Sequence, residues 1–336
     1  MTQPTTTYSL SPSLQDFVET SQGFAPVDDS LEARRAAFVR ACRHFTPTVP
    51  QGLRVEDLAL GDLRLRLYHP DAPPPEGGWP TVLYLHGGGW DLGNLDSHDW
   101  FAYRLARRLP TAIVAVDYRL APDHPFPAPL EDALAAWMAL RNGELHPALS
   151  THRLAVAGDS AGGTLAAGLC RALLERDLAQ PLLQLLAYPV LSASDDLPSM
   201  TEHARTPTLT TQSLAKSLDG FLPRFAQRLN PCAMPLQAQQ FEGLAAAFIG
   251  VAEFDPLRDQ GHAYHRVLQQ AGVPSQLHMG RGLLHASLRA QGSDEVERFY
   301  DAMGQALRLA LYPTRHSHYL EQSRRCATKV IFKAGP

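Results

Sequence analysis

The chain alternates short apolar runs with segments of helical periodicity. Six runs have the length and composition of buried strands, at residues 81–86, 112–118, 153–159, 182–188, 246–254 and 275–280. Helical segments such as 130–142 and 263–272 lie between them. Strands that are apolar throughout and alternate with helices predict a mostly parallel sheet with helices on both faces.

Two more strands precede these six. Residues 52–70 alternate apolar and polar positions around Gly61, with Leu63, Leu65 and Leu67 on one face and arginines on the other. Such alternation is typical of a half-exposed antiparallel hairpin. The pattern therefore predicts an α/β fold with an eight-stranded, mostly parallel sheet.

The remaining segments suggest additions to this sheet. Residues 1–50 have a helical pattern, clearest at 30–45, and no strand pattern. Between the fourth and fifth apolar runs lie 57 residues (189–245), which exceeds an ordinary crossover, so we expect a helical cap insertion at about 192–235. We therefore divide the chain into an N-terminal cap segment (1–50), a main domain (51–313) and a basic tail (314–336), which we expect to be disordered or an extension.

Composition narrows the possible partners. The 336 residues are 45% hydrophobic and carry a formal net charge of -4, which argues against a nucleic-acid-binding surface. The N-terminus lacks the features of a signal peptide and no apolar run could span a bilayer, so we expect a cytoplasmic protein without membrane insertion. The four cysteines form no C-x-x-C pair, which predicts neither a disulfide framework nor a metal site.

Ser160 is the first candidate for chemistry. It stands in G-D-S-A-G (158–162), a match to G-x-S-x-G, between a predicted strand and a predicted helix. That motif places a serine on a sharp turn at the sheet edge, where the helix N-terminus favours developing negative charge. The alternative is a glycine-rich phosphate-binding turn, but G-x-G-x-x-G and a Walker lysine are both absent.

A serine nucleophile needs a base and an acid to orient that base. Asp255 directly follows a predicted strand, whereas the competing Asp259 falls in the next helix. Among fourteen histidines, His285 follows the last strand by a short loop; His278 lies within that strand, and His262 and His265 lie on a helix. The order Ser160, Asp255, His285 is the order of the α/β-hydrolase fold.

A glycine loop after an early strand supplies a candidate oxyanion hole. The stretch His86–Gly89 can turn backbone N–H groups toward a developing oxyanion, and we assign the donors to Gly87, Gly88 and Ala161. For His86 itself we expect a structural hydrogen-bonding role. Trp90, beside this loop, is a candidate wall of the substrate pocket.

Four motifs together resemble a known family. They are HGGGW (86–90), DYRLAPDHPFPAPLED (117–132), GDSAGG (158–163) and DPLRDQG (255–261), and in this order they resemble the hormone-sensitive-lipase-like bacterial carboxylesterases over about residues 50–310. The resemblance implies an α/β-hydrolase fold with a helical cap, a Ser160, Asp255 and His285 triad, an HGGG oxyanion hole and no cofactor.

The resemblance has two departures. In the second motif Asp123 replaces the family's glutamate, in a segment that we interpret as scaffolding behind the nucleophile. After the catalytic histidine the family usually has glycine and an aromatic residue, whereas this chain has Ala286 and Ser287. The basic tail has no counterpart in the family pattern.

The leading functional hypothesis is a carboxylesterase that cleaves short to medium acyl esters through an acyl-enzyme. The expected partner is a small ester, and the family often forms homodimers, so a homodimer is possible here. Two alternatives stay open: the same triad acting on an amide, peptide or lactone, and a ligand-binding receptor on the same fold.

Overall fold

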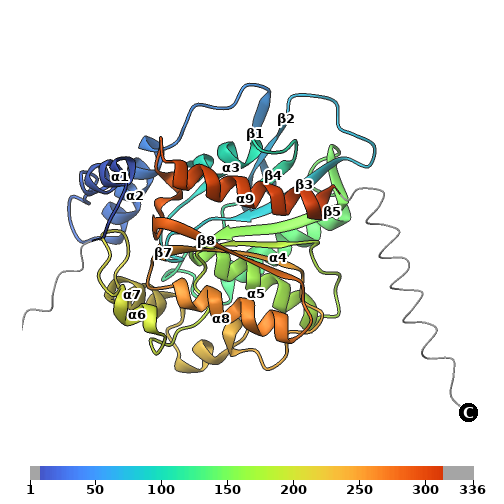
Figure 1. The fold of residues 1–336 in the computed structure, drawn as a ribbon. Helices are drawn as coiled ribbons and strands as arrows, with labels where there is room; N and C mark the ends of the chain where they lie inside the picture. Colours follow the sequence, from blue (N-terminus) through green and yellow to red (C-terminus); the bar gives the residue numbers. More distant parts are fainter. Residues whose placement is uncertain (1–7, 313–336) are drawn as a thin grey trace, which may run out of the picture.

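One sheet organises the chain. The computed structural model describes residues 8–312, and within them an eight-stranded sheet has the order β1-β2-β4-β3-β5-β6-β7-β8 (Figure 1). From β4 to β8 all neighbouring pairs are parallel, and β2 is antiparallel to both of its neighbours. The strands are β1 (Leu53–Leu60), β2 (Leu63–Pro70), β3 (Trp79–Leu85), β4 (Ala112–Val116), β5 (Leu149–Asp159), β6 (Gln184–Ala187), β7 (Ala247–Phe254) and β8 (Ser275–Leu284).

The predicted strands are confirmed, with two of them longer than expected. Every residue of β3 and β4 is buried, as the continuous apolar runs require. In the predicted hairpin, Leu65 and Leu67 are fully buried and the turn at Gly61 has φ 58°. Strand β5 begins four residues early, and β8 continues beyond residue 280 because a register shift lets Leu284 pair with Phe254.

Helices cover both faces of the sheet (Figure 1). Alternate residues of β4 separate the two sides of the core: Val114 packs with one buried cluster and Ile113 with the other. The first side carries α4 (Ala128–Asn142), α5 (Ala161–Glu175) and α8 (Arg258–Gln270), and the second carries α3 (Asp99–Ala106) and α9 (Asp294–Leu311). The α/β-hydrolase fold class predicted from the sequence is confirmed.

The N-terminal and inserted segments form further helices. Residues 8–50 contain α1 (Pro12–Gln22) and α2 (Leu31–His44), which begins after Ser30, whose Oγ accepts the N–H of Ala33 at 3.1 Å. The segment 192–235 contains α6 (Pro198–Glu202), α7 (Thr211–Phe221) and the 3₁₀ turn η2 (Phe225–Leu229), and η3 (Pro235–Gln237) follows. The division into domains stays a prediction, and the basic tail (314–336) lies outside the described residues.

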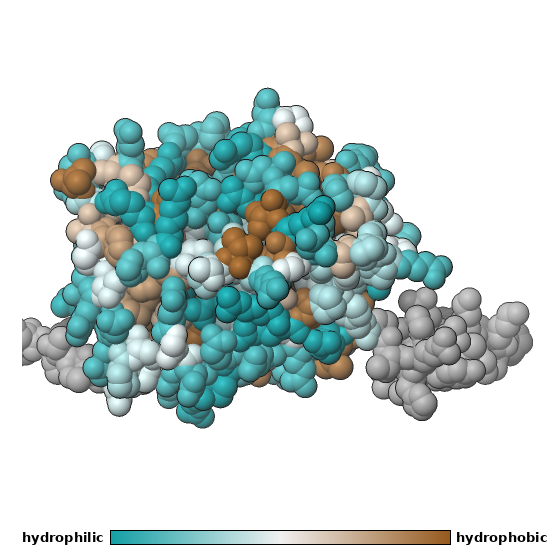
Figure 2. Space-filling model, turned by 90° about the horizontal axis from the view of Figure 1, so that it is seen from above, coloured by the Kyte–Doolittle hydropathy of each residue, from teal (hydrophilic) through white to brown (hydrophobic). Residues whose placement is uncertain are grey.

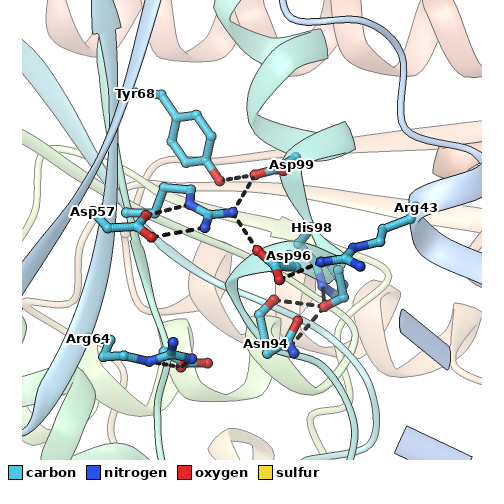
Figure 3. A network of polar contacts seen from close by, with 11 residues as sticks. Arg43, Asp57, Arg64, Tyr68, Asn94, Asp96, His98 and Asp99 are labelled. Atoms are coloured by element: carbon cyan, nitrogen blue, oxygen red, sulfur yellow. Dashed lines mark hydrogen bonds and ion pairs between the residues drawn. The ribbon is translucent and has the colours of Figure 1, made fainter. Parts of the chain in front are cut away.

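A charged network joins the hairpin to the helices on one side of the sheet (Figure 3). Arg66 of β2 binds Asp57 of β1 at 2.6 Å, Asp96 of the 3₁₀ turn η1 (Leu95–Ser97) at 3.0 Å and Asp99 of α3 at 3.3 Å. Arg43 of α2 binds the second oxygen of Asp96 at 2.6 Å. One arginine therefore connects four elements of the chain.

One face of the molecule is mainly hydrophilic (Figure 2). Figure 2 shows the face above α9 and α3, on which hydrophobic residues occupy small separate areas. Leu309 of α9 is among the exposed apolar residues. Within residues 8–312 no helix is long and apolar enough to cross a membrane.

Candidate active site

Ser160 occupies the sharp turn between β5 and α5. Its φ of 52° and ψ of -120° lie in a region that residues with a side chain rarely adopt. The turn is possible because its neighbours lack a Cβ: one at Gly158 would overlap the backbone of Gly162, and one at Gly162 would overlap the carbonyl of Leu85. The sequence thus forces the serine hydroxyl to the carboxyl edge of the sheet.

The structure brings the three predicted triad residues together. Ser160 Oγ lies 2.8 Å from Nε2 of His285, and Nδ1 of His285 lies 2.8 Å from Oδ2 of Asp255. Asp255 directly follows β7, is fully buried, and also accepts the N–H of Leu257 at 2.8 Å. A proton on Nδ1 of His285, held by Asp255, leaves Nε2 free to accept the proton of Ser160.

The competing residues lie elsewhere. Asp259 is on α8, where it accepts the N–H of Ser199 at 2.9 Å and pairs with Arg258. His278 packs against Phe299, with 5.1 Å between ring centroids. Neither side chain contacts Ser160 or His285, so neither can replace the assigned acid or base.

The loop after His285 explains one departure from the family pattern. Ala286 has φ 59°, a left-handed conformation for which glycine is the usual choice. Ser287 turns its hydroxyl back to the carbonyl of Leu284 at 2.7 Å. Alanine therefore adopts the conformation that the family's glycine would supply, and His285 stays in place.

The predicted role of Gly87 is wrong. Its N–H donates to Oδ1 of Asp159 at 2.9 Å in the protein interior, so it is not available to an oxyanion. The N–H groups of Gly88 and Gly89 have no acceptor among residues 8–312, and both residues line the same cavity as Ser160. Ala161 begins α5, so its N–H has no intrahelical acceptor. From this geometry we expect the donors to an oxyanion to be the N–H groups of Gly88, Gly89 and Ala161.

A buried polar cluster lies behind the glycine loop. The carboxylate of Asp159 accepts the hydroxyl of Tyr84 at 2.6 Å as well as the N–H of Gly87, and burial raises the pKa of this carboxyl. His86 stacks on Tyr118, with 4.3 Å between ring centroids, and on His98 at 5.1 Å. Burial lowers the pKa of His86, which keeps its ring neutral near pH 7 and suits the structural role expected from the sequence.

The triad opens into a cavity of about 440 Å³. Trp90 is fully buried in its wall and stacks on Phe221 of α7, with 4.4 Å between ring centroids. Phe38 of α2 and Leu214 of α7 also line the cavity. The N-terminal and inserted segments therefore supply walls of the cavity, and the sheet edge supplies Ser160 and His285.

The N-terminal helix α2 is fixed to this site by two arginines. Arg34 pairs with Asp91, which follows the glycine loop, at 3.0 Å. Arg35 donates to the carbonyl of Asp91 at 2.9 Å and to that of Ala121 at 3.1 Å.

Among residues 8–312 no group of three or more histidine, cysteine, aspartate or glutamate side chains could hold a metal ion.

Comparison with known proteins decides the family. A family model described as "alpha/beta hydrolase fold" matches residues 82–289, which include the glycine loop, Ser160, Asp255 and His285. The chain belongs to this α/β hydrolase family.

Curated relatives of this hydrolase carry ester-hydrolase names. Esterase LipI of Mycobacterium tuberculosis is 40% identical over 268 residues, which are 77% of this chain and 82% of LipI. Carboxylesterase NlhH of the same species is 38% identical over 298 residues, 85% of this chain and 91% of NlhH. Ethyl acetate hydrolase of Pseudomonas putida is 41% identical over 228 residues, 68% of this chain and 72% of the relative.

Solved structures agree with these relatives. A thermostable esterase from Pseudomonas putida superposes with a TM-score of 0.83 at 27% identity, covering 92% of this chain and all of the other. An esterase of the bacterial hormone-sensitive lipase family superposes with a TM-score of 0.80 at 24% identity, which shows the shared fold. Together with the curated relatives, these findings confirm the resemblance to carboxylesterases of the α/β-hydrolase fold.

Sequence reasoning missed three features of the hydrolase site. It did not single out Gly89, Asp159 or the arginines that line the cavity. The sequence did indicate that Asp159 lies near the site, because it occupies the variable position before Ser160 in G-x-S-x-G. It likewise indicated Arg289, which lies four residues after His285, but not Arg34, because the distance of Arg34 from Ser160 along the chain gives no hint of proximity.

Proposed function

We propose that this chain hydrolyses carboxylic esters with short to medium acyl groups. Ser160 is the nucleophile, His285 the general base and acid, and Asp255 the group that orients His285. The observation that carries the proposal is the continuous hydrogen-bonded series from Ser160 to Asp255, with 2.8 Å at each step, at the wall of a cavity. The names of the relatives support ester substrates.

Acylation begins when Ser160 Oγ attacks the ester carbonyl carbon. Nε2 of His285 takes the serine proton, and Asp255 stabilises the imidazolium that forms. The carbonyl oxygen becomes an oxyanion, which the N–H groups of Gly88, Gly89 and Ala161 hold. Such donors act on charge that develops only in the transition state, and removing one typically costs about a hundredfold to a thousandfold in kcat.

Acylation ends when His285 donates its proton to the departing alkoxide, which leaves an ester between the acyl group and Ser160. Deacylation then repeats the sequence with water. His285 then removes a proton from water, the hydroxide attacks the acyl carbon, and Ser160 leaves with the proton that His285 returns. The products are an alcohol and a carboxylic acid.

The size of the cavity supports the acyl range. About 440 Å³ is near the lower end of ligand pockets, which accommodates a small ester. The stacked pair of Trp90 and Phe221 closes one side of this space. A long acyl chain would have to leave the cavity and expose its methylene groups to water.

Hydrolysis of p-nitrophenyl esters from acetate to palmitate tests the proposal. We expect turnover to be highest on the short esters and to fall beyond the medium lengths. Ser160→Ala should lose at least about a thousandfold of kcat, because no other group can form the acyl-enzyme. The control is Ser194→Ala, a loop serine outside the cavity, which should retain activity.

Equal turnover by the intact protein and Ser160→Ala would contradict the nucleophile assignment. If the intact protein hydrolysed no ester of the series, the ester proposal itself would fail, and the amide, lactone and receptor alternatives would replace it. A cytoplasmic location and a homodimer remain predictions, and light scattering of the purified chain measures the second.

A further inference from the structure

The cavity beside Ser160 contains two cations that no carboxylate neutralises. Arg34 is paired with Asp91 at 3.0 Å, and the carboxylate of Asp159 is occupied by Tyr84 and Gly87. Arg289 and Lys216 also line the cavity, and neither has a carboxylate oxygen within 4.0 Å among residues 8–312. The cavity thus has an excess of positive charge that its own residues do not balance.

The side chain of Arg289 is held in place by the N-terminal helices. Its guanidinium carbon lies 5.6 Å from the ring centroid of Phe17 on α1 and 5.5 Å from that of Phe38 on α2. Nη1 donates to Sγ of Cys42 at 3.0 Å. These contacts fix the orientation of the guanidinium four residues after His285, so the group is ordered before any ligand enters.

The hydrogen-bonding capacity of Arg289 is mostly unused. A guanidinium has five N–H donors, and a thiol is a weak acceptor for one of them. Nε is buried and has no acceptor within the described part of the chain. Because a half-buried guanidinium with unused donors can still form paired hydrogen bonds, such an arginine in a ligand cavity is suited to a planar anion, above all a carboxylate.

Lys216 adds a second, more mobile charge. It is the only lysine among residues 8–312 and stands on α7, next to Ser217, which lines the same cavity. Its side chain is exposed, so solvent and salt screen its charge more than that of Arg289. Lys216 can therefore attract an anion to the cavity but orients it less.

We propose that the cavity accepts esters that carry a carboxylate, and that Arg289, assisted by Lys216, binds that carboxylate. The substrate class is the half-ester of a short dicarboxylic acid, or an ester whose alcohol part carries the acid. In both, the carboxylate reaches Arg289 while the ester carbonyl lies at Ser160. This inference rests on the proposed esterase function and adds a substrate class to it.

Two matched pairs of esters test the inference. Monoethyl glutarate against ethyl butyrate places the carboxylate in the acyl part, and acetoxyacetate against ethyl acetate places it in the alcohol part. Alkali uptake at constant pH gives kcat/KM for each ester. We expect the intact protein to hydrolyse the charged ester of at least one pair as efficiently as its neutral partner, and the responding pair identifies the side on which the carboxylate binds.

Three variants assign the effect to residues. Arg289→Met should lower the ratio of charged to neutral kcat/KM by about tenfold or more, as expected when a charge-assisted hydrogen bond is lost. Lys216→Met should lower it by roughly threefold, because its charge is screened. The matched control is Arg281→Met, which removes an arginine that is 80% exposed and outside the cavity, and it should leave the ratio unchanged.

The outcomes separate this inference from the function on which it rests. If the intact protein hydrolyses neither neutral ester, the esterase proposal fails. If it hydrolyses the neutral esters but Arg289→Met leaves the ratio within about twofold, the carboxylate site is rejected, since a lost charge-assisted hydrogen bond costs more than that.

An inhibition measurement covers the case in which Arg289→Met does not fold. Glutarate should compete with p-nitrophenyl acetate for the intact protein at lower concentration than its neutral diamide, glutaramide, does, and added sodium chloride should reduce this difference. Equal inhibition by the two compounds would overturn the inference without any variant.

Discussion

Asp159 connects Ser160 to the loop that carries the proposed oxyanion donors. It precedes Ser160 in the chain, and its carboxylate accepts the N–H of Gly87 and the hydroxyl of Tyr84. Gly88 and Gly89 follow directly, so the direction of their N–H groups depends on this anchor. Asp159 is therefore a positioning residue whose effect reaches the substrate through the glycine loop.

Replacing Asp159 tests this role. In Asp159→Ala we expect kcat on p-nitrophenyl acetate to fall by roughly tenfold to a hundredfold with little change in KM, because misdirected donors stabilise the transition state less. Asp159→Asn retains an acceptor oxygen for Gly87 and should recover most of the rate. A change in KM alone, or no recovery in the asparagine variant, would contradict the role.

The positions of the three proposed triad residues could be predicted from the sequence, but the proposed oxyanion donors could only be narrowed to a loop. Ser160, Asp255 and His285 each follow a strand of one parallel sheet, so strand ends bring them together whatever the details of packing. Three successive glycines offer no such rule, because each N–H direction depends on local dihedral angles. The side chain of Asp159 accepts the N–H of Gly87, so this N–H is bonded within the protein and the other two are not. That contact joins residues 72 positions apart.

At the scale of elements, the network around Arg66 decides how the hairpin meets the rest of the fold (Figure 3). The Arg66 side chain is only 14% exposed, and it faces the carboxylates of Asp57, Asp96 and Asp99. Arg43, which shares Asp96, is 61% exposed. Burial, more than the number of ion pairs, separates the expected contributions of the two arginines.

Arg66→Met should therefore lower the free energy of unfolding by about 2 kcal/mol, since it removes the shared cation from three neighbouring carboxylates, of which only Asp96 keeps another arginine. Arg43→Met should cost less than about 1 kcal/mol, because the pair that it breaks is exposed and screened. Urea unfolding of both variants measures the difference. Equal losses would show that burial does not control this network.

The elements themselves were predictable to different degrees. The buried strands β3 and β4 could be predicted because both of their faces are covered by helices, which requires a continuous apolar run. The extension of β8 was not predicted, and within the helical pattern of residues 1–50 the bounds of helix α1 were not located, because each depends on contacts with distant residues. In β8 the stretch after residue 280 includes Gly282 with φ 73°, a conformation that no periodicity indicates.

At the scale of the whole molecule, buried histidines link stability to pH. Burial lowers the pKa of His86 and lowers that of His98 well below its usual value. The folded state then keeps these rings neutral at a pH where the unfolded chain binds protons. Their contribution is fully present above the unfolded pKa of about 6.5 and is lost as the pH falls below it.

We expect the free energy of unfolding to decrease from pH 7 to pH 5.5, by up to about 1.4 kcal/mol per pH unit for each fully buried histidine. His98→Asn should show a smaller decrease, since asparagine takes up no proton and can still meet the hydroxyl of Ser97. Urea unfolding of both proteins at each pH gives the difference, in which the carboxyl groups cancel. Parallel pH profiles would exclude His98 as a source of the effect.

The walls of the cavity and its catalytic groups come from separate parts of the chain. Phe38 and Leu214 belong to helices outside the sheet, whereas Ser160 and His285 follow strands within it. Substitutions in the helices can therefore change which esters enter the cavity without changing Ser160 and His285. A library of substitutions restricted to α2 and α7 would explore new substrates from a scaffold that already performs the chemistry.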